Sequence, residues 1–204
     1  MPEIIKRKAQ PNLFDQEKAL QKTCWAWEAA GLADLYYFDE TGFSLTPCVP
    51  YAWQPKCKAT LGIPSAHSQR INVLGFMNRH SQSFFQTTTG RVTSDVVIDC
   101  FDQFAENHAE RCGGEIKPCF VILDNASMHR SHAFKAKQDD WEAQGVFLHF
   151  LPPYSPELNL IEILWRKIKY SWLSLAAYKS MDTLKGELSK VLNGVGEKYC
   201  ITFS

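Results

Sequence analysis

The sequence lacks net charge and long apolar runs, and each absence excludes a class of protein. Its 22 Lys and Arg residues balance 22 Asp and Glu residues, which excludes a globally basic nucleic-acid binder, so any DNA-binding surface must be local. The longest apolar run is Cys119–Leu123, far shorter than the ~20 residues of a membrane-spanning helix. The start of the chain has no signal-peptide core. We therefore expect a cytoplasmic protein with no membrane partner.

Paired cysteines are also absent, because the seven cysteines form no Cys-x-x-Cys motif. This odd, scattered set favours reduced cysteines in the core or on the surface over a disulfide or zinc framework. His129 and His132 could share one helical face as metal ligands, but no nearby cysteine or third histidine completes a zinc site. The fold is therefore expected to need no structural metal.

What the sequence does contain is an ordinary globular composition, with 204 residues of which 45% are apolar and 13% aromatic. This length and composition indicate one domain. Strand-like and helix-like segments alternate after an initial strand meander, which predicts an α/β fold with a mixed sheet and helices on its faces. The predicted strands are 35–38, 51–53, 70–77, 83–89, 119–123 and 146–151, and the predicted helices are 11–33, 94–108, 131–144, 160–175 and 181–192.

Three acidic residues follow a pattern typical of a metal site. Asp39 and Asp124 each come directly after an apolar strand, before a polar turn. If the two strands are adjacent and parallel, both carboxylates meet at one edge of the sheet. Carboxylates held together repel unless a cation lies between them, and hard cations such as Mg²⁺ and Mn²⁺ take oxygen ligands. Glu162, near the start of a later helix, is the candidate third acid.

Each of these acids also has a structural alternative. Asp39 and Asp124 could be turn residues whose side chains bond to their own backbone. Asn159 and Glu162 fit a capping box, in which Asn159 caps the helix and Glu162 reaches back to it. The order of the acids along the chain, strand end, strand end and helix, favours a common site.

Three segments resemble the signature blocks of mariner-like DDE transposases of the bacterial insertion-sequence branch. They are 38–43 (FDETGF), 123–129 (LDNASMH) and 151–165 (LPPYSPELNLIEILW), and the third is long enough to be highly specific. The resemblance implies a ribonuclease-H-like fold with a mixed five-stranded sheet flanked by helices. It also implies a helical lead-in over 1–34, a catalytic domain over 35–175 and a helical extension of that domain over 176–204.

The resemblance also implies an activity. Asp39, Asp124 and Glu162 would hold two Mg²⁺ ions, which Mn²⁺ can replace, in an endonuclease and polynucleotidyl transferase. Such a site cuts the ends of a transposable element and joins them to target DNA, typically at a deformable TA step. The implied partners are the terminal inverted repeats and the target DNA, bound by a homodimer. The implied location is the bacterial cytoplasm, at the nucleoid when on DNA.

Further residues within and just after these blocks are candidates for supporting roles. Asn125 and His129, beside the second acid, could orient it or contact DNA phosphates. Arg166 and Lys169, after Glu162, are candidate phosphate contacts. Positive charge gathers in the segment 165–190, with six Lys or Arg against two acids, whereas 94–115 has six acids against one Arg. A local basic face would reconcile zero net charge with DNA binding.

The sequence departs from the family pattern in two respects. Between Asp124 and Glu162 lie 37 residues, slightly more than the spacing usual in the family. Only 34 residues precede the first predicted strand, too few for helix-turn-helix domains that read the terminal repeats. The chain could be the second reading frame of a split gene, a truncated copy or a catalytic fragment, and another chain could supply those domains. Tyr154 and Asn159 are expected to shape the approach to Glu162. Two alternatives stay open: an inactive or accessory DNA-binding remnant, and a ribonuclease-H-like nuclease without strand transfer.

Overall fold

The computed structural model describes residues 11–48, 69–113, 115–153 and 155–202. The chain divides into two compact units. The first unit comprises the chain up to Asp39 together with Thr93–Leu160, and the second comprises Glu40–Val92 and the chain from Ile161 onward. The first strand of the sheet passes from the first unit into the second.

Five strands form one mixed sheet in the order β3-β2-β1-β4-β5. β4 pairs in parallel with both β1 and β5, whereas β2 and β3 are antiparallel. This arrangement confirms the predicted α/β class and the five-stranded mixed sheet. The segment 51–53, also predicted to be a strand, lies outside the described residues. The strands are β1 Asp34–Phe43, β2 Ile71–Asn78, β3 Ser83–Thr88, β4 Cys119–Leu123 and β5 Val146–Phe150.

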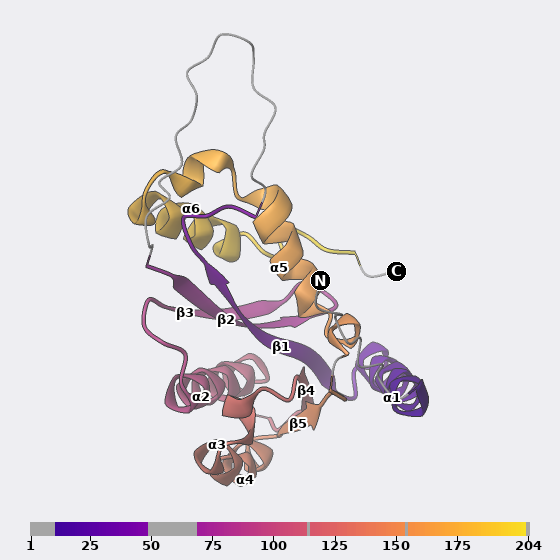
Figure 1. The fold of residues 1–204 in the computed structure, drawn as a ribbon. Coiled ribbons are helices and arrows are strands. Elements are labelled where there is room, and N and C mark those ends of the chain that lie inside the picture. Colours follow the sequence, from indigo (N-terminus) through magenta and orange to yellow (C-terminus); the bar gives the residue numbers. More distant parts are fainter. Residues whose placement is uncertain (1–10, 49–68, 114, 154, 203–204) are drawn as a thin grey trace. The chain divides into compact units, whose positions relative to one another are not determined.

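Helices cover both faces of the strands within the first unit (Figure 1). Successive side chains of a strand point to opposite faces, so neighbouring tyrosines of β1 pack against different helices. Trp25 of α1 donates its Nε1–H to the Tyr37 hydroxyl at 2.9 Å, and Phe104 of α2 lies 5.1 Å from the Tyr36 ring. The helices of this unit are α1 Pro11–Ala29, α2 Ser94–Arg111, α3 His132–Ala136 and α4 Gln138–Ala143.

The helix predicted over 131–144 is divided into α3 and α4, and a 3-10 turn, Ser127–Arg130, precedes them. The division lets two aromatic side chains reach α2. The rings of Phe134 and Trp141 lie 5.3 and 5.0 Å from the ring of Phe101. Gly145 ends this region with a φ of +85°, a left-handed conformation that favours glycine.

β1 is longer than the sequence pattern predicts. The prediction that the strand ends at residue 38 and that a polar turn begins at Asp39 is wrong, because β1 continues to Phe43. Gly42, which suggested a turn, lies in the strand where the Arg70 side chain crosses it. A Cβ at Gly42 would lie 1.5 Å from Arg70 Nε, and glycine inside a strand often marks such a close approach.

In the second unit, α5 packs on the β2–β3 hairpin. Trp165 of α5 contacts the hairpin at Gly75, where a Cβ would lie 2.7 Å from the indole, and its ring lies 6.1 Å from Phe85. Among the described helices, none is both long and apolar enough to span a bilayer. The helical elements are α5 Ile161–Lys167, a π-helical turn Ile168–Trp172, a 3-10 turn Leu175–Lys179 and α6 Met181–Asn193.

Candidate active site

The parallel pairing of β1 with β4 brings two of the predicted acids to the same end of the sheet. In this pairing Tyr37 lies beside Ile122. Asp39 and Asp124 each lie two residues beyond this pair, toward the same end of the two parallel strands. The expectation that the two strands are adjacent and parallel is confirmed.

Hydrogen bonds from the turn after β4 hold the Asp124 carboxylate. The Ala126 backbone N–H donates to Asp124 Oδ1 at 2.9 Å. His129 Nδ1 lies 3.0 Å from the same oxygen and 3.1 Å from the Asp124 carbonyl oxygen, and since both oxygens can only accept, Nδ1 carries the proton. The hydrogen bond from His129, followed by that from Ala126, lowers the pKa of the Asp124 carboxyl against the opposing effect of burial.

His129 is itself rigidly held. Its side chain is 1% exposed, and its ring lies 5.6 Å from the rings of both Phe38 and Phe134. The 3-10 turn that carries it begins only three residues after Asp124. Of the two roles predicted for His129, its burial favours orientation of Asp124 over contact with a DNA phosphate.

Asn125 and its neighbours join the ends of β4 and β5. The Asn125 side-chain amide donates to the Leu151 carbonyl, and the Leu151 N–H donates to the Leu123 carbonyl at 2.8 Å. These contacts therefore hold the end of β4, which directly precedes Asp124, against the end of β5. The DNA contact predicted for Asn125 stays a prediction, and the Asn125 amide already donates one hydrogen bond to the Leu151 carbonyl.

Asn159 supplies a second brace at this end of the sheet. The buried Asn159 side chain donates from Nδ2 to the Phe38 carbonyl at 2.9 Å. This contact fixes the segment that leads to α5 against β1, at the residue that directly precedes Asp39. No sequence signal pointed to this contact, because it joins residues 121 positions apart.

Glu162 lies in the first turn of α5, in the second unit, with an exposed side chain. The capping-box alternative is wrong. α5 begins at Ile161, and Asn159 Oδ1 accepts no hydrogen bond from the described residues, because the Asn159 amide is drawn to the backbone of β1. The role of Glu162 as the third acid stays a prediction, and Tyr154, predicted to shape the approach to it, lies outside the described residues.

The two basic residues predicted to contact DNA differ in their surroundings. Arg166 is exposed on α5. Lys169 is half-buried, and its Nζ donates to the Thr41 hydroxyl at 2.6 Å and lies 5.5 Å from the centre of the Phe43 ring. Lys169 therefore joins the π-helical turn to β1, whereas the Arg166 guanidinium faces solvent.

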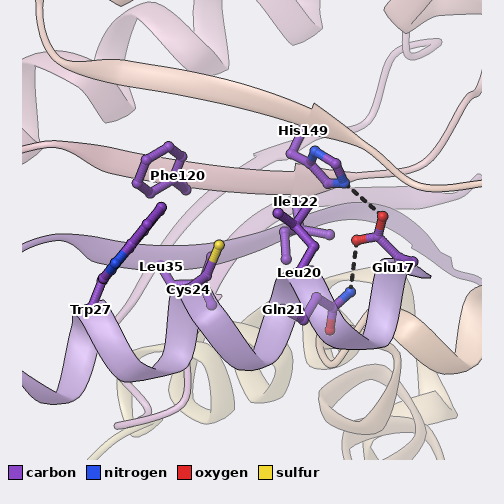
Figure 2. Close-up of a pocket in the computed structure, with 9 residues that line it drawn as sticks. All are labelled: Glu17, Leu20, Gln21, Cys24, Trp27, Leu35, Phe120, Ile122 and His149. Carbon is purple, nitrogen blue, oxygen red and sulfur yellow. Dashed lines mark hydrogen bonds and ion pairs between the residues drawn. The ribbon is translucent and has the colours of Figure 1, made fainter. Parts of the chain in front are cut away.

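A separate pocket of about 210 Å³ lies between α1 and the sheet (Figure 2). It is lined mainly by apolar side chains, and its polar groups bond to one another. His149 Nε2 lies 2.8 Å from Glu17 Oε2, and Gln21 Nε2 donates to Glu17 Oε1 at 3.4 Å. None of the predicted site residues lines this pocket, so it is not part of the carboxylate site.

Sequence comparison places most of the chain in a known family. The model of the DDE superfamily endonuclease family matches residues 34–185. The uncharacterized protein y4pE/y4sA of Sinorhizobium fredii is 30% identical over 98 residues, which make up 47% of this chain and 68% of that protein.

Solved structures of the Mos1 transposase have the same fold. The Mos1 mariner paired end complex with Mn matches with a TM-score of 0.62 at 12% identity, over 97% of this chain and 63% of that chain. The Mos1 transposase catalytic domain with raltegravir and Mg matches with a TM-score of 0.59 at 13% identity, over 94% of this chain and 88% of that chain. The chain thus spans less than two thirds of the longer transposase chain. The fold is that of ribonuclease-H-like transposase catalytic domains, and the chain belongs to the DDE superfamily of endonucleases.

Proposed function

We propose that this chain is the catalytic domain of a transposase that cuts the ends of a DNA element and joins them to target DNA. The observation that carries the proposal is the parallel pairing of β1 with β4, which directs Asp39 and Asp124 toward the same end of the two strands, in a chain of the DDE superfamily. Within it we assign a helical lead-in to 1–34, the catalytic domain to 35–175 and its helical extension to 176–204. The family match over residues 34–185 supports the first of these boundaries.

Asp39, Asp124 and Glu162 are proposed to hold two Mg²⁺ ions, which Mn²⁺ can replace. The three side chains offer carboxylate oxygens, the donors that these hard cations prefer. The lowered pKa of Asp124 supports this role, because a ligand must be ionised to bind a metal. When bound, the ions would activate the attacking oxygen and stabilise the leaving oxygen. Mn and Mg are named with the Mos1 structures, which agrees with this choice.

The short length of chain between Asn159 and Glu162 supports Glu162 as the third acid. Asn159 is bonded to the carbonyl of Phe38, the residue before Asp39. Three residues of fully extended chain span at most about 11 Å, so the backbone of Glu162 stays within that distance of Asn159. Because this length of chain is short, the flexible Glu162 side chain, in the first turn of α5, can reach the proposed metal site.

His129 acts in this proposal as a positioning residue. Its Nδ1–H bonds to Asp124 Oδ1, and its buried ring is fixed between Phe38 and Phe134. The histidine therefore restricts the rotation of the carboxylate and keeps it ionised. Ligands held in this way need less reorganisation when a metal binds.

The proposed partner is DNA, in the form of the terminal inverted repeats of the element and a target site that contains a TA step. Arg166 is the proposed phosphate contact, because its guanidinium is exposed near the start of α5, whereas Lys169 has a partner in Thr41. We further propose that the chain works as a homodimer on DNA and that it acts at the bacterial nucleoid in the cytoplasm.

The direct test offers the purified chain two DNA substrates in the presence of Mg²⁺ or Mn²⁺. One is a supercoiled plasmid, and the other is a pre-cut element end with a free 3′-hydroxyl mixed with target DNA. The proposal predicts nicked plasmid and covalently joined products, both abolished by a chelator.

The same assay separates the two alternatives. Nicking without joined products would identify a ribonuclease-H-like nuclease that lacks strand transfer. If neither nicked plasmid nor joined DNA forms with either metal, even after a helix-turn-helix partner chain is added, the chain is an inactive or accessory remnant. Both outcomes contradict the proposed function.

A further inference from the structure

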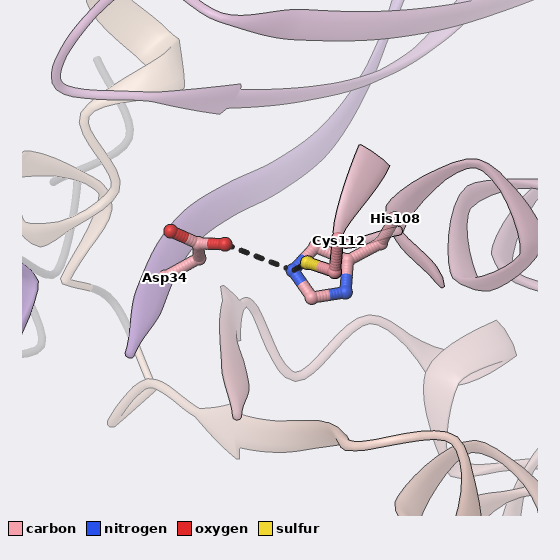
Figure 3. Close-up of side chains that lie close together, drawn as sticks. All are labelled: Asp34, His108 and Cys112. Carbon is pink, nitrogen blue, oxygen red and sulfur yellow. Dashed lines mark hydrogen bonds and ion pairs between the residues drawn. The ribbon is translucent and has the colours of Figure 1, made fainter. Parts of the chain in front are cut away.

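Three metal-ligating side chains meet in the first unit, away from the predicted acids. Asp34 comes from the start of β1, His108 from the last turn of α2, and Cys112 from the residue that follows α2 (Figure 3). His108 Nε2 lies 3.0 Å from Asp34 Oδ2 and 3.8 Å from Cys112 Sγ. The three ligand atoms all lie within 4.8 Å of one another.

The fold explains why these side chains converge. His108 and Cys112 are four residues apart, so they project from the same side of the end of α2. Asp34 shares the strand face of Tyr36, against which α2 packs. Lys117 Nζ bonds to Asp34 Oδ1 at 2.7 Å, which fixes the carboxylate and leaves Oδ2 directed at His108.

We propose that Asp34, His108 and Cys112 form a binding site for Zn²⁺. Zinc takes this mixture of oxygen, nitrogen and sulfur ligands. Tetrahedral angles and metal–ligand bonds of about 2.0–2.3 Å give ligand separations of about 3.4 Å for nitrogen to oxygen and about 3.6 Å for nitrogen to sulfur. The observed 3.0 and 3.8 Å are close to these values, and the oxygen-to-sulfur separation is within 4.8 Å, so the three ligands can close on one ion after side-chain adjustment.

The surroundings of the three ligands also suit a bound ion. His108 is 3% exposed and the Asp34 side chain is 25% exposed, so the site is shielded yet open to an entering ion. Lys117 supplies the hydrogen bond to a ligating carboxylate that metal sites commonly contain. The fourth position of a tetrahedral ion is left to water.

This zinc site is distinct from the proposed catalytic site. Asp34 and Asp39 are five residues apart on β1, which corresponds to about 17 Å at about 3.3 Å per residue. A zinc ion there would join the end of α2 to the start of β1, and so stabilise the first unit without taking part in DNA cleavage. The sequence pattern could not indicate it, because the ligands come from separate segments without a Cys-x-x-Cys motif.

The test is a titration of the reduced, chelator-treated full chain with Co²⁺, followed by displacement with Zn²⁺. A thiolate–cobalt charge-transfer absorption should appear, saturate at about one ion per chain and disappear when Zn²⁺ is added. Cys112→Ala should abolish the absorption, and Asp34→Asn should weaken Co²⁺ binding by at least about 10–100-fold. Cys100→Ala, in the same helix, is the matched control and should leave the absorption intact, as should Asp124→Asn.

A second readout does not depend on any variant. Zn²⁺ should protect Cys112 of the unmodified chain from alkylation, as located by peptide mass spectrometry, and should leave the exposed Cys200 reactive. Absence of the thiolate–cobalt absorption in the unmodified chain, or equal alkylation of Cys112 with and without Zn²⁺, would overturn the proposal.

Discussion

At the scale of single residues, Asp124 depends on a histidine five positions further along the chain. The His129 Nδ1–H serves both a carboxylate oxygen and the carbonyl oxygen of Asp124. This double contact closes the turn and sets the carboxylate at the same time. The sequence placed His129 beside the acid but left open whether it orients Asp124 or contacts DNA, and the burial of its ring distinguishes these roles.

Replacement of His129 by Ala should weaken metal-dependent activity. Loss of the Nδ1–H frees the Asp124 carboxylate to rotate, and supporting hydrogen bonds of this kind are worth about 10–100-fold in metal affinity or activity. The measurement is the Mg²⁺ concentration needed for half-maximal plasmid nicking. His132→Ala, an exposed histidine in α3, should leave this concentration unchanged, and the same result for His129→Ala would contradict the positioning role.

Tyr36 predicts a pH dependence of stability. Burial raises the pKa of Tyr36 from 10.0 to about 12, although Arg111 opposes this shift. The folded state therefore keeps a proton that the unfolded state loses, so this contribution to stability is complete below pH 10 and is lost as the pH rises through 12. The loss amounts to about 2–3 kcal/mol for a shift of this size.

The variant Tyr36→Phe tests this dependence by urea denaturation at increasing alkaline pH. Loss of the Arg111 hydrogen bond, 2.6 Å long, should lower the free energy of unfolding at neutral pH by about 1 kcal/mol. The variant should nevertheless lose less stability than the unmodified chain above pH 10. Tyr170→Phe, at an exposed tyrosine, is the control, and an identical alkaline decline in Tyr36→Phe would rule out the assigned cause.

At the scale of elements, the length and burial of the apolar strands made most of the fold predictable. β4 matches the predicted residues 119–123, because a continuous apolar run needs burial on both faces. The extension of β1 was not predictable, because Asp39–Gly42 resembles a turn. The contacts that keep it extended, from Arg70 and Lys169, come from distant parts of the sequence.

A pair of glycine substitutions tests how α5 and α6 are stabilised. At Gly75 in β2, a Cβ would lie 2.7 Å from Trp165 and 2.9 Å from Phe85, so Gly75→Ala should lower the free energy of unfolding by about 1–3 kcal/mol. At Gly186 in α6, a Cβ would have no atom within 4 Å apart from its chain neighbours and the backbone of its own helix. Gly186→Ala should therefore stabilise the chain by up to about 1 kcal/mol through helix propensity.

Urea denaturation of both alanine variants and the unmodified chain measures these effects. The account of packing in the second unit requires shifts of opposite sign. A stabilising effect of Gly75→Ala would contradict the close contact between β2 and the Trp165 indole.

At the scale of the whole molecule, zero net charge hides an uneven distribution. Acidic residues gather along α2, whereas basic residues follow Glu162. Some residues of each group have partners within the protein. Asp102, of the acidic group, pairs with Lys137 at 3.1 Å, and Lys169, of the basic group, donates a hydrogen bond to Thr41. Charge counts along the sequence therefore overstate the charge that is available to DNA.

Arg166→Ala should weaken DNA binding in a salt-dependent way. Removal of one phosphate contact should reduce the slope of log K against log salt by about one and weaken binding to all DNA sequences about equally. Fluorescence anisotropy with a short duplex at several salt concentrations measures the slope. Lys185→Ala, at an exposed lysine of α6 that is not a proposed DNA contact, is the control and should leave the slope unchanged. Equal slopes for Arg166→Ala and the unmodified chain would exclude the contact.

The site was predictable in part. Asp39 and Asp124 were candidates from the sequence because each directly follows an apolar run, and the pairing of β1 with β4 is the arrangement that the prediction required. The Asn159 contact with Phe38 and the cluster of Asp34, His108 and Cys112 could not be located, because they depend on which segments the fold brings together.

Asp124 is proposed to be a metal ligand of a DNA-cutting and DNA-joining site. The most direct measurement compares Asp124→Asn with the unmodified chain in the nicking and strand-transfer assay. Asp95→Asn, at an exposed aspartate of α2, is the control, and circular dichroism checks that each variant is folded. Asp124→Asn should fold but lose activity by about 10³-fold, the effect of several kcal/mol of metal stabilisation, while Asp95→Asn should stay active. Equal activity of Asp124→Asn and the unmodified chain would contradict the account.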